Sequence, residues 1–326
     1  MEIKLSIAIP TYNGASTIRE TLNSIVSQLE DSVETVVSDN ASTDETAEIV
    51  QEYQSKYPVI RYFCNGENLG FDRNCDLAVR RSKGEYVWLF SDDDKLANGA
   101  IEKVMDVIRK YADIAAIFVN YKGSVLLNCA YDRFCLSGDD FFSKTAFKNG
   151  LISSNIIKKS VWGSIDVTKY FSTGWIHMGF LVEALSVHPA FIISHPFLLQ
   201  VGAKEIRWGK RGSFFYTGLR LVKIFKIMSA VGYNESTIKR AIFVIKGGYL
   251  RNIPLAKAEG LRVDLALIKE LYSLYKEFPS FWLLDLPLIL LPRWVYQLVW
   301  KVYQIPLIKR IYRRSKSWIR YKWPRS

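Results

Sequence analysis

Three consecutive aspartates, Asp92, Asp93 and Asp94, follow Ser91, which comes straight after the apolar run 86–90. This run is rich in β-branched and aromatic residues, which predicts a buried central strand. Side chains at the carboxyl end of such a strand face the crevice where open α/β sheets bind ligands. Carboxylates that converge from one short turn suit Mg²⁺ or Mn²⁺, with phosphate oxygens completing the coordination shell. The triplet therefore predicts a divalent-cation site; the alternative is a solvated acidic loop before the helix that begins near Ala97.

Polar residues also follow three other predicted strands. These stretches are Pro-Thr-Tyr-Asn-Gly at 10–14, Ser-Asp-Asn-Ala-Ser-Thr-Asp at 38–44 and Asn-Gly-Glu-Asn-Leu-Gly-Phe-Asp-Arg-Asn at 65–74. Because the carboxyl ends of parallel strands meet at one edge of a sheet, we expect all of them to open onto the crevice beside the aspartates.

The elements that must position these residues alternate in type along the first part of the chain. Strand-like runs are predicted at 5–9, 33–37, 59–64, 85–90 and 114–119, with helical patterns at 18–29, 42–57, 71–81 and 97–111. This alternation predicts an α/β fold with a mostly parallel, doubly wound, Rossmann-like sheet and right-handed crossovers. The pattern is mixed from 122 to 201 and helical from 213 onwards, with helices expected at 216–228, 236–250 and 263–276.

Together, the four strand-end motifs resemble those of glycosyltransferase family 2, whose members have the GT-A fold and bind nucleotide sugars. The family shows a P-x-[YF]-N opening, an S-D-x-S-x-D second strand end, an N-x-G-x-x-x-x-[RN] loop and a terminal acidic cluster. Counterparts of all four occur here in the same order. The likeness covers about residues 4–120 and extends more loosely to about Gly212. It implies that 1–120 is the nucleotide-sugar-binding half of a GT-A domain and 121–212 the acceptor-binding half.

The resemblance implies a donor site built from the strand ends. Asp39 would accept hydrogen bonds from a pyrimidine N–H or a ribose, although an Asx-turn or a helix N-cap explains it equally well alone. Thr11 and Tyr12 would lie against the base, with plain core packing as the alternative. Arg73 would meet the diphosphate or the base edge, unless it forms a surface ion pair. The other expected donor-binding residues are Pro10, Asn13, Asn40, Asn68 and Gly70.

In the acidic cluster we expect Asp93 to bind the cation, Asp92 to bind the ribose or the cation, and Asp94 to support the cluster or contact the sugar. The third aspartate leaves this register ambiguous by one residue. The acceptor hydroxyl also needs a base. The family's E-D pair is missing from the corresponding stretch 172–180, so His177 is the expected substitute, with Asp166 and Glu183 as alternates.

A basic, glycine-containing loop at 204–212 precedes the helical region. Arg207, Lys210 or Arg211 could counter the charge of the diphosphate while Trp208 seals the site; a solvated linker is the alternative. Within the family, the sequences at 38–44 and 68–74 and the neighbourhood of 160–162 look similar to abequosyltransferase-like enzymes. Those enzymes attach a deoxysugar during O-antigen synthesis.

Composition narrows the class of protein further. The chain has 326 residues, 49% of them hydrophobic, and a formal net charge of +12. Ten basic and no acidic residues follow Asp285, so the charge is concentrated at the carboxyl end. A nucleic-acid-binding surface would spread it more widely, and no recognised module accompanies it. The four cysteines form no C-x-x-C pair, and the first residues lack the pattern of a signal peptide, so we expect a reducing compartment.

The last part of the chain combines apolar and basic residues. The apolar stretch 281–291 is too short to span a bilayer. In 293–304 and again after Pro306, aromatic and aliphatic residues oppose basic ones. Such helices lie in the interface of an anionic membrane. Packing against the catalytic domain and an oligomer contact are the alternatives. We thus expect a helical region at 213–280 and membrane-interface helices at 281–326.

These observations lead to one expectation. The chain should be a metal-assisted, inverting glycosyltransferase that moves a sugar from a nucleoside-diphosphate sugar to a lipid-linked or cell-surface glycan. It should work as a peripheral protein at the cytoplasmic face of the inner membrane. The alternatives are a catalytically silent, membrane-anchored nucleotide-sugar-binding protein and a sugar nucleotidyltransferase. Residues 10–14 lack the Gly-rich Arg/Lys loop of the last class.

Overall fold

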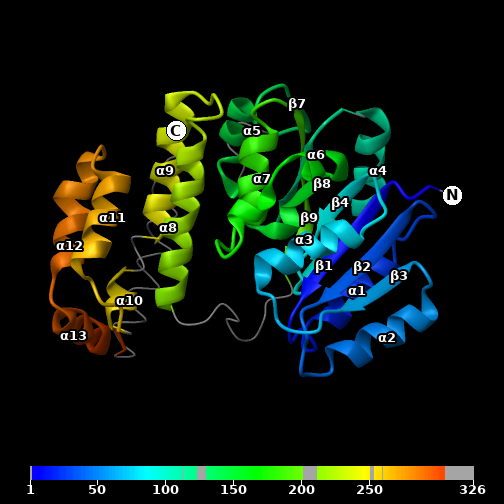
Figure 1. Cartoon of the computed structure of the whole chain (residues 1–326), viewed down its shortest axis with the longest axis horizontal. Coiled ribbons are helices and arrows are strands. Elements are labelled where there is room, and N and C mark those ends of the chain that lie inside the picture. Colours follow the sequence, from blue (N-terminus) through cyan, green and yellow to red (C-terminus); the bar gives the residue numbers. More distant parts are fainter. Residues whose placement is uncertain are drawn as a thin grey trace. The chain divides into compact units, whose positions relative to one another are not determined.

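The computed structural model describes residues 2–111, 113–122, 130–200, 211–249, 253–258 and 260–304. The chain divides into two compact units. The first comprises Met1–Arg207 and Arg220–Val244, and the second comprises Trp208–Leu219 and Ile245–Ser326. The predicted strand-end motifs all lie in the first unit, which holds the β-sheet (Figure 1).

Nine strands of the described residues form one sheet. They are β1 (Leu5–Thr11), β2 (Val33–Asp39), β3 (Ile60–Cys64), β4 (Tyr86–Leu89), β5 (Asp94–Leu96), β6 (Ala116–Tyr121), β7 (Arg133–Cys135), β8 (Asn155–Lys158) and β9 (Ala190–Gln200). The helices that follow them in the first unit are α1 (Ile18–Val26), α2 (Thr46–Lys56), α3 (Phe71–Arg81), α4 (Ala100–Lys110), α5 (Gly138–Thr145), α6 (Lys159–Ser164) and α7 (Ile176–Ala184). The strands and helices predicted up to residue 121 are therefore present, with ends shifted by a few residues.

The strand order is β3-β2-β1-β4-β8-β6-β9-β5, and β7 pairs with β9. Four pairings are parallel and four are antiparallel. The α/β prediction is confirmed, but the sheet is mixed rather than mostly parallel. The strands joined by helical crossovers, β1 to β4 and β6, do share one direction. The reversed strands are β5, β7 and β8, which have three or four residues each and gave no clear strand pattern.

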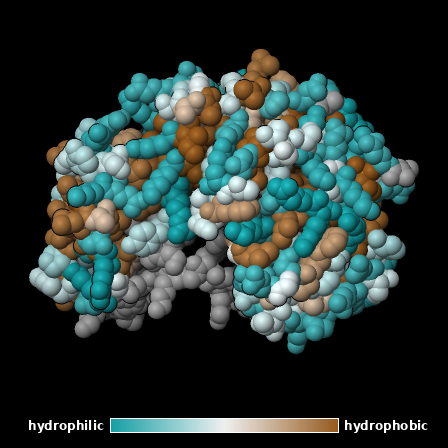
Figure 2. Space-filling model, viewed as in Figure 1, coloured by the Kyte–Doolittle hydropathy of each residue, from teal (hydrophilic) through white to brown (hydrophobic). Residues whose placement is uncertain are grey.

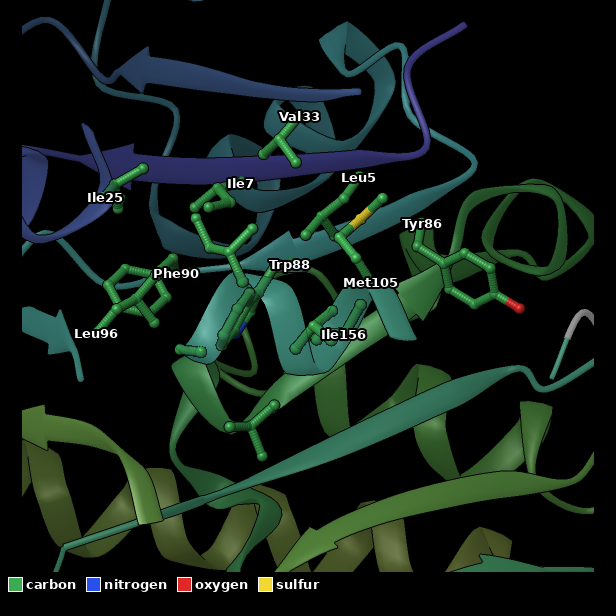
Figure 3. Packing of buried hydrophobic residues seen from close by; sticks show 14 of the residues in the cluster. Leu5, Ile7, Ile25, Val33, Tyr86, Trp88, Phe90, Leu96, Met105 and Ile156 are labelled. Carbon is green, nitrogen blue, oxygen red and sulfur yellow. The ribbon is translucent and has the colours of Figure 1, made fainter. Parts of the chain in front are cut away.

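The core of the sheet lies between β1, β4 and the helices α1 and α4. Figure 3 shows Leu5, Ile7, Trp88, Phe90 and Met105 packed together there. The rings of Trp88 and Phe90 meet edge to face, with centroids 5.7 Å apart. The indole N–H of Trp88 donates a 2.6 Å hydrogen bond to the carbonyl of Ser153, which satisfies the polar end of a fully buried side chain. The aromatic run before the aspartates is thus a fixed support for them.

Helices follow the sheet in the chain. They are α8 (Arg211–Ile227), α9 (Glu235–Tyr249), α10 (Ile253–Ala258), α11 (Leu265–Tyr275), the π-helix η5 (Phe281–Asp285), α12 (Leu286–Leu290) and α13 (Arg293–Gln304). The helices predicted at 216–228, 236–250 and 263–276 correspond to α8, α9 and α11. In the second unit, Phe281 packs against Tyr275, with ring centroids 6.1 Å apart. Within the described residues, no helix is both long and apolar enough to cross a membrane.

Candidate active site

The carboxyl ends of the first strands lie in register at one edge of the sheet. Thr11, the last residue of β1, is the pairing partner of Asp39, the last residue of β2, and Asp39 pairs in turn with Cys64 of β3. On the other side of β1, the backbone N–H of Phe90 donates 2.8 Å to the carbonyl of Ala8, so the aspartate triplet begins beside Thr11. The structure therefore brings the predicted strand-end motifs together at one edge.

A short hydrogen bond joins the first motif to the triplet. The hydroxyl of Thr11 donates 2.5 Å to Oδ2 of the buried Asp92. Gly14 passes directly over this pair, because a Cβ at that position would lie 2.4 Å from both Asp92 Oδ2 and Thr11 Oγ1. The glycine is therefore required by the close approach of the carboxylate, and the end of β1 helps to orient Asp92.

Asp94 supports the triplet from behind. It is 2% exposed, and its Oδ2 accepts a 2.6 Å hydrogen bond from the Ser153 hydroxyl, which itself accepts 2.9 Å from the backbone N–H of Ser91. Burial raises the pKa of Asp94 to about 6; the charges of Asp93 and Asp92 add to the shift, while the Ser153 hydrogen bond opposes it. Asp94 thus lies on the buried side of the triplet, as a support.

Asp93 lies on the more open side of the triplet and bonds to the hydroxyl of Ser91. The turn beneath is closed by the Thr21 hydroxyl, which donates 2.9 Å to the Asp92 carbonyl and 2.8 Å to the Asp94 carbonyl. Among the described residues, no cluster of three or more His, Cys, Asp or Glu side chains is arranged to hold a metal ion. A pair of carboxylates is nevertheless what Mg²⁺ needs when phosphate oxygens complete its shell. Asp92 and Asp93 fit a cation of this kind.

The second motif folds around Asp39. Its Oδ1 accepts hydrogen bonds from the backbone N–H and the hydroxyl of Ser42, at 2.9 and 2.6 Å, and its Oδ2 accepts 2.7 Å from the Tyr62 hydroxyl. Asp39 thus binds the backbone three residues further along, one residue beyond an Asx-turn, and it is not the N-cap of α2, which is Glu45. The same turn meets the first motif, since Asn13 Oδ1 accepts 2.8 Å from the backbone N–H of Thr43. Asp39 is buried and oriented by three donors, and its role toward a nucleotide stays a prediction.

A buried polar network, which the motifs did not reveal, lies under this edge. Asn74 Oδ1 accepts from Ser38 at 2.7 Å and from Asn65 at 3.1 Å, and its amide donates 2.8 Å to the Ser38 carbonyl. Arg81 donates to the hydroxyl of Ser38 and to the side chain of Asn65, at 2.8 and 2.9 Å. The only hint in the sequence was the recurrence of asparagine at the strand ends. The network fixes the third motif against β2.

The third motif is held by Asn40. Its side-chain amide donates 2.8 Å to Asn68 Oδ1, and its own oxygen accepts 3.0 Å from the backbone N–H of Leu69. Gly70 follows with φ 84°, a conformation that favours glycine, and α3 begins at the next residue. Asn40, Asn68 and Gly70 therefore form one loop at the sheet edge.

Of four further predicted donor contacts, Tyr12 and Arg73 are exposed, while Pro10 and Asn13 are half-buried. Tyr12 is 44% exposed, so it is not a core residue, and Asn13 takes the left-handed conformation with φ 52°. Pro10 stands in β1 opposite Ser38. Arg73 is exposed and stacks over the ring of Phe171, with its guanidinium carbon 5.2 Å from the ring centroid. Its contact is therefore a cation–π stack rather than the surface ion pair considered above.

The candidate bases occupy different surroundings. His177 is 2% exposed in α7, and within the described residues neither ring nitrogen has a hydrogen-bond partner. Burial lowers its pKa to about 4; the nearby Gly150 backbone opposes this, although its geometry falls short of a hydrogen bond. Asp166 is exposed and caps a 3₁₀ turn through Thr168, which lowers its pKa. Glu183 pairs with Lys169 at 2.7 Å and accepts from the Tyr170 hydroxyl.

The three candidate bases differ in whether their side chains already bind neighbouring groups. The carboxylates of Asp166 and Glu183 are committed to neighbouring groups, whereas the His177 ring is not. The predicted loop residues Arg207, Trp208 and Lys210 lie outside the described residues, as does the basic stretch after Gln304, and the side chain of Arg211 is not described either.

The comparison with known families agrees with the geometry of this edge. The sequence pattern of the family described as Glycosyl transferase family 2 matches residues 6–161. The chain carries a family 2 glycosyltransferase domain. The matched range begins in β1 and ends in α6, so it contains all four strand-end motifs.

Characterised sequences similar to this glycosyltransferase carry related names. Over 261 residues it is 28% identical to the abequosyltransferase RfbV of Salmonella typhimurium, a match that covers 73% of this chain and 78% of that one. Over 200 residues it is 28% identical to the GalNAc(5)-diNAcBac-PP-undecaprenol beta-1,3-glucosyltransferase of Campylobacter jejuni, which covers 58% and 64% of the two chains.

Solved structures place the glycosyltransferase in the GT-A fold. TarS of S. aureus (residues 1–349), solved with UDP-GlcNAc, superposes with a TM-score of 0.61 at 17% identity, covering 85% of this chain and 82% of that one. The mannosyltransferase PcManGT of Pyrobaculum calidifontis, solved with GDP-Man and Mn²⁺, gives a TM-score of 0.53 at 17% identity, covering 94% and 88%. The predicted fold is confirmed, and the predicted family is confirmed for the domain at 6–161.

Proposed function

We propose that this glycosyltransferase moves a sugar from a nucleoside-diphosphate sugar to a lipid-linked glycan, by cation-assisted inverting displacement. One observation carries the proposal: Thr11, Asp39 and the Asp92–Asp93 pair meet at the same strand edge. The names of the similar proteins support the reaction class, and two structural neighbours were solved with a nucleotide sugar, one of them also with Mn²⁺. The C. jejuni relative, named for an undecaprenol-linked substrate, supports a lipid-linked acceptor.

The residues of the edge divide the work of binding the donor. Asp39 and Tyr12 would bind the nucleoside, and the guanidinium of Arg73 would bind the diphosphate. Asp93, with Asp92 beside it, would hold the cation. A bound Mg²⁺ or Mn²⁺ supplies Lewis-acid stabilisation of the negative charge that develops on the departing diphosphate. Asp94 keeps the triplet in place through Ser153.

Among the residues considered as the base, we retain His177. Both ring nitrogens lack a partner within the described part of the chain, so the ring has an acceptor nitrogen available. Burial lowers its pKa to about 4, which makes it a weaker base than an exposed histidine. A neutral imidazole can take up the proton of the acceptor hydroxyl. For this role the acceptor hydroxyl must reach the ring of His177, which is buried in the protein without substrate.

The direct experiment is a screen of UDP-, GDP-, CDP- and dTDP-sugars for hydrolysis or transfer that depends on Mn²⁺. We expect wild-type activity with one donor class and its loss on adding EDTA. Asp93→Ala should abolish this activity while the protein still folds, and the exposed Asp31→Ala serves as the matched control. Unchanged turnover in Asp93→Ala would refute the assignment of the cation ligand. Binding without turnover in the wild type would instead indicate a silent nucleotide-sugar-binding protein.

We also propose that the chain works at the cytoplasmic face of the inner membrane. Large hydrophobic side chains that face solvent gather in 282–298, which we call the apolar ridge. Its members are Trp282, Leu283, Leu284, Leu288, Leu290, Leu291, Trp294 and Leu298. Figure 2 shows hydrophobic atoms gathered over the region labelled α12 in Figure 1. Exposed apolar surface next to a basic segment fits a bilayer whose cytoplasmic leaflet is anionic.

The ridge is held from the inside by two buried lysines of the same unit. Lys246 bonds to Asp285 and, at 2.8 Å, to the Ser280 hydroxyl. Lys257 donates to the carbonyls of Ile289 and Leu291, at the end of α12, and burial lowers its pKa. Buried cations are costly unless they are paired in this way. Lys257 fixes backbone carbonyls at the end of α12 and Lys246 fixes side chains at the start of the ridge, while the leucines of the ridge remain exposed. This arrangement supports a docking surface.

Co-sedimentation with vesicles tests this part separately from catalysis. The full chain should bind vesicles of phosphatidylglycerol and phosphatidylethanolamine, and less well those of phosphatidylcholine. The triple variant Leu283→Ser, Leu284→Ser, Trp294→Ser should lose most of this binding. The matched control changes two exposed side chains of the first unit, Leu136→Ser and Val187→Ser. Undiminished binding of the triple variant would contradict the role of the ridge, and a fall in oligomeric state would identify it as a contact between copies.

A further inference from the structure

The start of α7 is capped by a residue from another helix. Asp72, in the first turn of α3, is 3% exposed; its Oδ2 accepts 2.8 Å from the backbone N–H of Gly174, and its Oδ1 accepts 3.1 Å from that of Ile176. Ile176 is the first residue of α7, and within the described residues its N-cap Trp175 makes no side-chain capping bond. A carboxylate at a helix N-terminus satisfies free N–H groups and interacts favourably with the helix dipole. Asp72 therefore performs the capping role across 104 residues of sequence.

The turn before α7 has a backbone that depends on outside support. Ser172 and Gly174 have φ values of 64° and 78°, and only glycine adopts such values readily. Arg73 stacks over Phe171 at the start of this turn, while Asp72 binds its end. Two successive residues of α3 thus hold both ends of the turn 171–176.

The carboxylate of Asp72 is engaged by backbone groups of this turn. Burial raises its pKa, and the N–H groups of Gly174, Ile176 and Thr173 act against that shift, so they stabilise the charged form. Removing the carboxylate would leave buried N–H groups without a partner, which is costlier than losing an exposed hydrogen bond. The contact between α3 and the turn is therefore specific for an acceptor at this position.

The same turn of α3 directly follows the loop 65–70, which we call the donor loop because it belongs to the stretch 65–74 that would bind the donor. Asn68 and Leu69 lie four and three residues before Asp72, and Asn40 holds both at the sheet edge. On the other side, His177 comes one residue after the Ile176 N–H that Asp72 binds. The first turn of α3 thus lies between the loop that would receive the nucleotide and the segment that carries the retained base.

We propose that Asp72 is a positioning residue that couples the donor loop to the start of α7. Binding of a nucleoside diphosphate at 65–74 draws on Arg73, changes its stack on Phe171, and through Asp72 sets the turn 171–176 and the His177 that follows. This inference rests on the proposed function, because it assumes that the strand edge binds a nucleoside diphosphate. It assigns no chemistry to Asp72 itself.

Hydrogen exchange measures the coupling without any acceptor. In the wild type, UDP, GDP, CDP or dTDP with Mn²⁺, whichever binds by calorimetry, should slow exchange in 65–74 and also in 171–178. In Asp72→Asn the nucleotide should still protect 65–74 but no longer 171–178, because the amide replaces one of the two accepting oxygens with an NH2 donor that faces a backbone N–H. Phe171→Leu, a variant near the surface end of the turn, should reduce the second effect in part. If Asp72→Asn fails to fold, Phe171→Leu provides the test instead.

The matched control is Asp76→Asn, one turn further along α3. Asp76 is also buried, but it accepts 3.0 Å from Trp162 Nε1 and pairs with Arg80 at 2.7 Å instead of binding the turn. Both variants should lose stability, yet the control should keep the nucleotide effect on 171–178. With a working donor, Asp72→Asn should lower kcat by at least about tenfold with a donor KM within about threefold, the pattern of a lost transition-state contribution.

The outcomes distinguish a failure of the proposed donor site from a failure of the coupling through Asp72. If no nucleoside diphosphate binds the wild type, the proposed function and this inference both fail. If the nucleotide binds and protects 65–74 while 171–178 responds equally in wild type and Asp72→Asn, the coupling through Asp72 is overturned and the donor site stands. An equal loss of coupling in Asp76→Asn would mean that α3 acts only through general stability, which also overturns it.

Discussion

Thr11 and Asp92 are 81 residues apart in sequence and share a 2.5 Å hydrogen bond at the edge of the sheet. The bond joins the end of β1 to the turn after β4, two strands that pair in parallel. One carboxylate oxygen of Asp92 is thereby oriented, and Asp93 stands on the more open side of the same turn. Thr11 is thus a support for the proposed cation site, in addition to any contact with the base of the nucleotide.

Thr11→Val should weaken the cation site while preserving the fold. Valine has nearly the shape of threonine but cannot donate to Asp92, and loss of a hydrogen bond to a charged group costs about 1.5–3 kcal/mol. We therefore expect the Mn²⁺ concentration for half-maximal activity to rise by roughly tenfold or more, since 1.4 kcal/mol corresponds to a factor of ten. A metal titration of donor hydrolysis measures this.

Thr35→Val is the matched control for that change. Thr35 is fully buried in the neighbouring β2, and its hydroxyl has no partner within the described structure. Replacing it should leave the metal dependence unchanged and leave stability unchanged or higher, because an unsatisfied polar atom is removed. An unaltered metal titration for Thr11→Val would show that its hydroxyl does not serve the cation site.

Gly14→Ala tests the close approach of the first motif to Asp92. The new methyl group would lie 2.4 Å from Asp92 Oδ2 and Thr11 Oγ1, so the turn or the carboxylate must move. We expect at least about tenfold lower activity, because small displacements of positioned groups cost this much. Gly163→Ala in α6 is the control, since nothing lies within 4 Å of a Cβ there and the residue is outside the proposed donor site. Equal activity of both variants would mean that the turn adapts without disturbing the triplet.

The sequence predicted the strand ends well because they depend on local patterns. The apolar run before Asp92 and the polar stretches after β1 and β2 each have a period or a turn signal of their own, and parallel pairing then brings them together. The reversed strands β5, β7 and β8 escaped because they are short and owe their place to long-range pairing. Strand direction in such segments is decided by tertiary contacts rather than by local propensity.

The contacts between side chains were harder to predict from the sequence, because they also depend on tertiary structure. Nothing in the local sequence distinguishes Asn74, which accepts from Ser38 and Asn65, from a surface asparagine. Asp72 likewise reads as an acidic residue in the first turn of its own helix, yet its bonds go to Gly174 and Ile176. Hydrogen bonds between distant segments become visible only once the fold places the segments side by side.

Asn74→Ala should therefore destabilise the first unit. The change removes three hydrogen bonds at 2.7–3.1 Å and leaves Ser38 and Asn65 short of partners in a buried site. We expect a loss of about 2–3 kcal/mol in the free energy of unfolding, since each orphaned buried group costs about 1–3 kcal/mol. Urea denaturation measures it, with the exposed Gln54→Ala as control. A loss no larger than that of the control would show that water replaces the network.

His177 should make the folded state sensitive to acid. Burial lowers its pKa from 6.5 to about 4 in the folded state. At pH 7 the ring is neutral in both states and contributes nothing to the difference. As the pH falls below 6.5 the unfolded chain takes up a proton that the folded chain does not, so stability is lost until about pH 4, where the folded ring is protonated as well. At 1.36 kcal/mol per pKa unit, the loss attributable to this ring is about 3 kcal/mol.

His177→Gln removes this titration. The unfolding free energy of the variant, measured by urea denaturation from pH 7.5 to pH 4, should fall less steeply than that of the wild type, with the two curves approaching each other as the pH is lowered. The reference for each protein is its own stability at pH 7.5, where the histidine is neutral, so the packing change does not enter the comparison. Parallel curves would mean that the pKa of His177 is the same in the folded and unfolded states, and the ring would then not be a source of acid sensitivity.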